Sequence, residues 1–128
     1  MPDGRQDSLM TGMTAAGLVK LTDKFYFYRA MANYFVYITT NPSKTTLYTG
    51  VTNDLLTRIK QHQENKGKAK TFAGRYYCYK LVYFEMYNDI NMAIEREKEI
   101  KDLSRARKEK LISSLNPKWN FYDPYNLV

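Results

Sequence analysis

Two short segments that favour β structure constrain the fold of this chain more than any other feature. Residues 34–40 and 46–51 are rich in Tyr, Val, Ile, Thr and Leu, and residues 41–44 between them read Asn-Pro-Ser-Lys. This pattern predicts two strands joined by a hairpin loop of about four or five residues. Because side chains alternate across a strand, Tyr37 and Tyr48 can face the same side of the hairpin. The sequence therefore predicts a pair of phenols on one face.

Turn residues and hydrophobic periodicity predict the remaining elements. They are a helix from Thr52 or Asn53 to about Glu64, a basic loop at residues 66–77, a third strand at residues 79–85, a helix from Asp89 or Asn91 to about Leu103, and a helix capped by Ser104 that ends at Leu115. The order is ββαβαα. A chain of 128 residues can bury one core and hardly two, so we expect one α/β (α+β) domain.

The first predicted helix carries two polar side chains on one face. Arg58 and His62 are four residues apart, and that spacing brings side chains together on a helix. Leu55, Leu56 and Ile59 form the apolar stripe, with His62 at its edge and Arg58 further round. Both side chains can therefore reach the rim of a cleft, although a histidine and an arginine in such places are also ordinary boundary residues.

The second predicted helix places a carboxylate on its apolar stripe. Ala93, Ile94 and Ile100 define that stripe, and Glu97 falls in its middle at about 100° per residue. An unpaired buried carboxylate costs several kcal/mol. Glu97 should therefore either pair with a Lys or Arg or lie at a cleft edge and bind a metal, and the helical pattern alone leaves both readings open.

The order of these elements resembles that of the GIY-YIG nucleases over residues 32–122. The matching segments are Tyr34–Ile38 with Phe35-Val36 in place of Gly-Ile, Leu47–Val51 with Thr49 in place of Ile, Asn53–His62 as the arginine helix, Ala93–Lys101 as the acidic helix, and Leu111–Trp119 as the closing element. The resemblance implies a three-stranded antiparallel sheet flanked by helices, and a metal-dependent endonuclease that acts on DNA in repair or processing.

The resemblance also implies roles for particular residues. A phenolate at Tyr37 or Tyr48 would take a proton from water, Arg58 would neutralise charge on the phosphate, and His62 would assist. Glu97 would hold Mg²⁺ or Mn²⁺, Gly50 would allow close backbone approach, and Asn116 would tie the tail to the site. Tyr37, Tyr48, Arg58 and Glu97 should converge on one cleft that solvent reaches. The same fold could instead serve as a nucleic-acid-binding or protein-interaction module.

The charge of the chain favours a polyanionic partner. Its formal net charge is +7 and its pI is about 9.4, which suits binding to nucleic acid. The predicted loop carries the candidate DNA-binding residues Lys66, Lys68, Lys70 and Arg75, although a solvated surface loop would look similar. No separate sequence-reading module is visible, so we expect specificity to come from a protein partner.

The remaining features concern compartment and boundaries. One cysteine, Cys78, and one histidine can form neither an intramolecular disulfide nor a Cys/His zinc site, and a reducing cytoplasm fits best. No apolar run is long enough to cross a membrane. We expect residues 1–30 to be an extension, disordered or not native, before a domain at residues 31–122 and a tail at residues 123–128.

Overall fold

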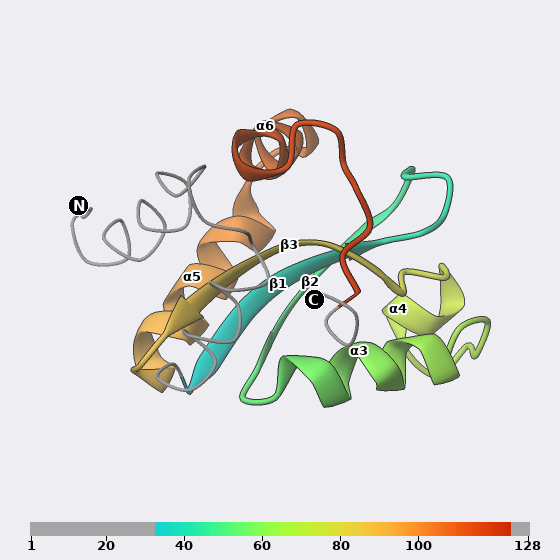
Figure 1. Cartoon of the computed structure of the whole chain (residues 1–128), viewed down its shortest axis with the longest axis horizontal. Coiled ribbons are helices and arrows are strands. Elements are labelled where there is room, and N and C mark those ends of the chain that lie inside the picture. Colours follow the sequence, from blue (N-terminus) through green and yellow to red (C-terminus); the bar gives the residue numbers. More distant parts are fainter. Residues whose placement is uncertain (1–32, 124–128) are drawn as a thin grey trace.

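The structure of the protein is a computed structural model, and it describes residues 33–123. Within this range three antiparallel strands form one sheet, in the spatial order β2-β1-β3. The strands are β1 (Tyr34–Thr40), β2 (Leu47–Thr52) and β3 (Lys80–Tyr87). The helices are α3 (Leu55–Glu64), α4 (Phe72–Arg75), α5 (Ile90–Asp102) and α6 (Arg105–Leu115). Figure 1 shows α3 and α5 on either side of the sheet.

The predicted fold class is confirmed, with three local corrections. The cap of α3 is Asp54, whose side chain accepts from the amide of Thr57, rather than Thr52 or Asn53. The third strand begins at Lys80 and continues to Tyr87, two residues beyond the predicted end. The basic segment predicted as a loop contains the four-residue helix α4. The predicted caps Asp89 and Ser104 are those of α5 and α6.

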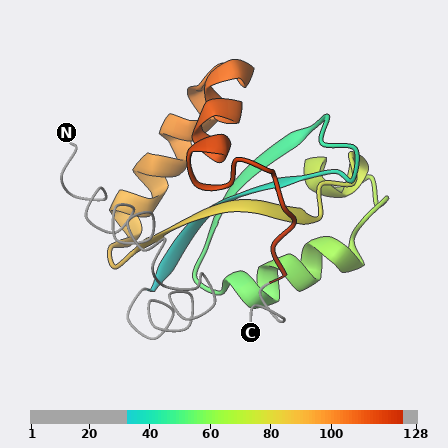
Figure 2. The ribbon, with the colours of Figure 1, turned by 45° about the horizontal axis from the view of Figure 1, so that its top comes forward.

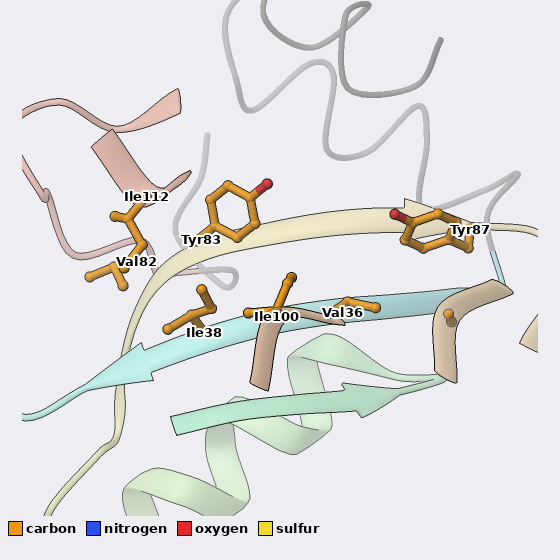
Figure 3. Close-up of a cluster of buried hydrophobic side chains, with 8 residues drawn as sticks. Val36, Ile38, Val82, Tyr83, Tyr87, Ile100 and Ile112 are labelled. Atoms are coloured by element: carbon orange, nitrogen blue, oxygen red, sulfur yellow. The ribbon is translucent and has the colours of Figure 1, made fainter. Parts of the chain in front are cut away.

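The two faces of the sheet carry separate cores. Phe35 and Tyr37 of β1 pack with the buried Leu55 and Ile59 of α3, as the predicted alternation requires. The opposite face of β1 packs against α5 and α6. Figure 2 shows these two helices on the other side of the sheet from α3, and Figure 3 shows the side chains of this second core. Its buried residues are Val36, Ile38, Val82, Tyr83, Tyr87, Ala93, Ile100 and Ile112. A functional side chain therefore lies on one face of the sheet, or it reaches the other face around the edge of the sheet.

An irregularity in β3 explains the position of Asn116. Ile38 pairs with Tyr83 whereas Thr39 pairs with Leu81, so Val82 is the extra residue of a bulge and loses its place in the ladder. The Asn116 amide donates to the carbonyl oxygen of Val82 at 2.9 Å. This bond satisfies a polar group that would otherwise be buried without a partner. Asn116 thus anchors the C-terminal turn to the sheet.

A buried carboxylate on the second face joins β3 to α5. Glu85 has no exposed surface, and it accepts hydrogen bonds from the phenols of Tyr83 and Tyr87. The guanidinium of Arg96 donates to the same carboxylate from Nε at 2.9 Å and from Nη2 at 3.0 Å. Both carboxylate oxygens are therefore satisfied, and the charge is paired. Sequence reasoning did not identify this network.

Replacing Arg96 by Met should destabilise the protein by about 3 kcal/mol, because a buried carboxylate would lose its cationic partner. Urea unfolding followed by circular dichroism would measure the change. The matched control is Glu109→Gln, which removes an exposed ion pair to Arg105 and should cost no more than about 1 kcal/mol. Equal losses in the two variants would contradict a stabilising role for the buried pair.

Candidate active site

The position of Tyr37 depends on the absence of a side chain at Gly50. These two residues are paired across β1 and β2, so both positions project to the same face of the sheet. A Cβ atom at position 50 would lie 2.6 Å from Cζ of Tyr37 and would also collide with its phenol oxygen. Glycine therefore lets the Tyr37 ring cross the neighbouring strand. The sequence predicts a close approach of the Gly50 backbone to a ligand; in this structure the group that lies against Gly50 is a side chain of the same chain.

Helix α3 brings a histidine and an arginine to this phenol. The buried side chains of Leu55 and Ile59 fix the helix against the sheet, and this orientation leaves Arg58 and His62 half-buried at the side of the core. His62 Nε2 lies 2.8 Å from the phenol oxygen of Tyr37. The positive charge of Arg58 acts to lower the pKa of the same phenol. The structure therefore brings Tyr37, Arg58 and His62 together.

The shifted pKa values keep both side chains of the pair uncharged. Burial, with a smaller contribution from the charge of Arg58, lowers the pKa of His62 to about 4. Burial and the neighbouring Tyr48 raise the pKa of Tyr37, and Arg58 offsets this only in part. At neutral pH both side chains are therefore neutral, and the tautomer of His62 sets which of the two donates the hydrogen bond.

Tyr37 is not open to solvent, contrary to the expectation that water reaches its phenol. Its exposed fraction is 0%, because α3 covers the face of the sheet on which it lies. Tyr48 is half-buried, with its ring centroid 6.3 Å from that of Tyr37 and 5.3 Å from that of His62. Of the two tyrosines, Tyr48 is the one that a substrate can contact.

Glu97 approaches the tyrosine cluster from the side of the sheet opposite to α3. It lies on α5, which packs against β1 and β2, and its side chain is 16% exposed. Lys101 Nζ is 3.2 Å from its carboxylate, so one of the two predicted readings, the ion pair, is present. The negative charge of Glu97 also raises the pKa of Tyr37. The carboxylate is therefore within electrostatic reach of the tyrosine cluster.

The donor set around Glu97 suits one particular kind of metal binding. Within residues 33–123 no three His, Cys, Asp or Glu side chains form a cluster that could enclose an ion. Mg²⁺ commonly keeps several waters and binds through one or two carboxylates together with substrate phosphates. A single, partly exposed glutamate fits that mode of binding, with the remaining ligands drawn from water and substrate.

The other predicted site residues lie around this cluster or apart from it. Lys66, Lys68, Lys70 and Arg75 are all exposed in the segment between α3 and β3. Lys66 has its ammonium 5.1 Å above the ring of Tyr79, and Arg75 donates to the carbonyl of Ala69. Asn116 belongs to the bulge of β3 and not to the tyrosine cluster.

Comparison with known proteins assigns the family. The model of the GIY-YIG catalytic domain matches residues 33–110, which include both strands of the hairpin, the helix with Arg58 and His62, and the helix with Glu97. The chain belongs to the GIY-YIG family. This membership places it in the GIY-YIG nuclease superfamily, as the sequence resemblance implied.

Relatives of this GIY-YIG protein include UPF0213 proteins. One from Natronomonas pharaonis is 39% identical over 82 residues, which cover 64% of this chain and 93% of the relative. Another from Clostridium perfringens is 47% identical over 77 residues, 60% of this chain and 81% of the relative. The solution NMR structure of a Bacillus halodurans UPF0213 protein is 34% identical and matches with a TM-score of 0.42, over 73% of this chain and 93% of that one.

Other sequence expectations concern parts of the GIY-YIG chain outside the site. Cys78 is buried and burial raises its pKa to about 11, which fits a structural thiol rather than a nucleophile. No helix within residues 33–123 has the length and apolar character needed to span a membrane. The predicted extension at residues 1–30 and most of the tail at residues 123–128 lie outside the described residues.

The stability of the domain should fall as the pH decreases from about 6.5 to about 4. Over this interval the unfolded state binds a proton at its histidine while folded His62, with a pKa of about 4, does not, so protonation favours unfolding. The loss should reach roughly 2–3 kcal/mol. Urea melts at pH 7 and pH 4.5 would measure it.

The control for this pH dependence is His62→Gln, which removes the only histidine in the chain. The stability of this variant should change less over the same interval, by about the amount assigned to His62. An unchanged pH dependence in the variant would show that carboxylates, and not His62, cause the loss.

Proposed function

We propose that this GIY-YIG domain is a metal-dependent endonuclease that hydrolyses phosphodiester bonds in DNA. The observation that supports it most directly is the hydrogen bond between Tyr37 and His62, 2.8 Å long, beside Arg58 and the more exposed Tyr48. Phosphodiester hydrolysis needs a base for the attacking water and positive charge for the phosphate. Tyrosine, histidine and arginine side chains from β1, β2 and α3 can supply both.

The buried and exposed tyrosines should have different roles. Tyr37 remains protonated and without solvent contact, so we assign it to positioning: it holds His62 through its hydrogen bond. Tyr48 is the group that can take the proton from water.

Arg58 and Glu97 complete the proposed mechanism. The guanidinium of Arg58 would neutralise the charge that develops on the phosphate in the transition state. Glu97 would hold Mg²⁺ or Mn²⁺, and such an ion supplies Lewis-acid activation of the phosphate when bound. Lys101 is paired with Glu97, so Glu97 would have to leave this pair to hold an ion.

The basic segment between α3 and β3 would bind the DNA backbone. Lys66, Lys68, Lys70 and Arg75 are exposed and can neutralise phosphates in a salt-dependent manner. We further propose that the protein works in the cytoplasm and depends on a protein partner for specificity. Repair or processing of DNA would be a suitable context for such an enzyme.

A binding module without efficient cleavage is the second candidate. Two observations favour it: Tyr37 is sealed from solvent, and Glu97 is already paired with Lys101. The two functions share the fold and the basic surface, and they differ only in the chemistry at Glu97 and Tyr48. Metal-dependent strand cleavage therefore separates them.

Replacing Glu97 by Gln should abolish Mg²⁺- or Mn²⁺-dependent nicking, because the amide is a poor ligand for these ions. Nicking of supercoiled plasmid and of branched, linear and single-stranded oligonucleotides would measure the effect. The fold should survive, since the variant loses only a partly exposed ion pair worth at most about 1 kcal/mol.

Glu95→Gln is the matched control, because Glu95 lies two residues away on the same helix with its side chain exposed. It should nick DNA at the wild-type rate. A Glu97→Gln protein with full activity, or one that unfolds in a thermal melt, would remove the assignment of Glu97.

The two tyrosines give a second test of the mechanism. Tyr48→Phe should lower the cleavage rate by about 10²- to 10⁴-fold, the usual contribution of a general base. Tyr37→Phe should cost roughly tenfold or less, the value of one neutral hydrogen bond. Single-turnover cleavage rates at pH 7 would compare them. The opposite ranking would assign the base role to Tyr37.

A further inference from the structure

A row of aromatic rings runs from the tyrosine cluster to the protein surface. The Tyr48 ring is stacked near that of Phe72, with centroids 6.4 Å apart and an interplanar angle of 24°. Phe72 in turn contacts Tyr76, the residue that caps the C-terminal end of α4, with centroids 4.7 Å apart. Tyr37 is fully buried, Tyr48 is half-buried, Phe72 is 51% exposed and Tyr76 is 44% exposed. The row therefore leads from the candidate site out into solvent.

The helix that carries the two exposed rings is held in place by close backbone contacts. A Cβ atom at Gly74 would lie 2.8 Å from the carbonyl oxygen of Asn65 and would also collide with that of Lys68. The Gly67 amide donates to the carbonyl of Gly74 at 2.8 Å. Thr71 caps the helix through the amide of Gly74. A helix of four residues cannot be stable alone, so these contacts fix Phe72 and Tyr76 in their exposed positions.

The surroundings of these rings are positively charged. Residues 65–77 contain the four exposed cations Lys66, Lys68, Lys70 and Arg75 and no acidic residue. Exposed aromatic rings among cations suit a strand of nucleic acid, whose bases stack on the rings while the phosphates contact the charges. An apolar protein segment could pack on the rings, but it would make no favourable interaction with the positive charges. Base pairs inside a duplex are already stacked on one another and offer no free face to an isolated ring.

We propose that Phe72 and Tyr76, at the two ends of α4, form a stacking subsite for an unpaired base of a DNA strand that enters the site at Tyr48. The strand would place its base on the exposed rings and its phosphates on the neighbouring lysines. This inference deepens the proposed function by naming single-stranded DNA as the substrate class. It rests on the proposed function only for the cutting step, because binding can be measured without cleavage.

Fluorescence anisotropy of labelled single strands of roughly twelve nucleotides, with the full chain in EDTA, tests the subsite. Phe72→Ala and Tyr76→Ala should each weaken binding by about fivefold to a hundredfold, the range for loss of one base–aromatic stack. Phe72→Trp should restore or improve affinity, because an indole also stacks. The matched control is Ile90→Ala: Ile90 is an exposed apolar residue, 39% exposed, at the start of α5, and Figures 1 and 2 show α5 and α4 at opposite ends of the sheet.

A second strand that keeps its phosphates but has abasic sites in place of bases isolates stacking from charge. Phe72→Ala and wild type should bind this strand, and a duplex of the same length, within about twofold of each other. Equal losses on the normal and abasic strands, or no loss on either, would overturn the subsite. Because Phe72 is half-exposed, its variants should fold, and Phe72→Trp gives an independent signal through quenching of the new indole by stacked bases.

Nicking assays on the same proteins separate this inference from the proposed function. Loss of single-strand affinity in Phe72→Ala, together with a wild-type protein that never cuts, would support the subsite and refute the nuclease. Metal-dependent cutting by the wild type, with Phe72→Ala unchanged in affinity, would refute the subsite and keep the nuclease. A preference for cutting unpaired strands that Phe72→Ala abolishes would support both.

Discussion

The site depends on the Tyr37 ring passing over Gly50. Any larger residue at position 50 would collide with the ring, and the phenol could not then reach His62 on α3. This one contact joins both strands of the hairpin to the helix that packs on them. It also removes the phenol from water, since the helix that supplies His62 covers the same face. The close approach of Tyr37 to Gly50 thus positions the side chains of the site. It also gives Tyr37, the most buried of them, a structural role.

Burial divides the cluster into neutral groups away from water and groups nearer solvent. The same desolvation lowers the pKa of His62 and raises that of Tyr37, so at neutral pH both side chains are uncharged. Arg58 then lies beside them without a competing cation. In the proposed mechanism, chemistry on a phosphate would use the groups nearer solvent, which are Tyr48 and the partly exposed Glu97. Exposure, more than residue type, would separate their roles.

The sequence predicted those parts of the molecule that local patterns determine. The hairpin, its alternation and the caps Asp89 and Ser104 follow from strand and helix signals within a few residues. Helix α4 could not be predicted, because it has four residues and is held by backbone atoms of the preceding turn, residues 65–68, rather than by its own propensity. The burial of Tyr37 was missed for a related reason: alternation gives the face of a side chain but not the helix that later covers it.

The sequence provided the least information about which side chains pair with the acidic residues. These pairs also connect the two faces of the sheet. Glu97 was expected to bind either a cation of the chain or a metal, and the structure pairs it with Lys101. Its neighbour Arg96 is tied to the buried Glu85 by three hydrogen bonds. Adjacent residues on a helix point about 100° apart, so fixing Arg96 on the sheet also fixes the direction of Glu97. The buried pair on one face therefore determines how a carboxylate can approach the tyrosines on the other.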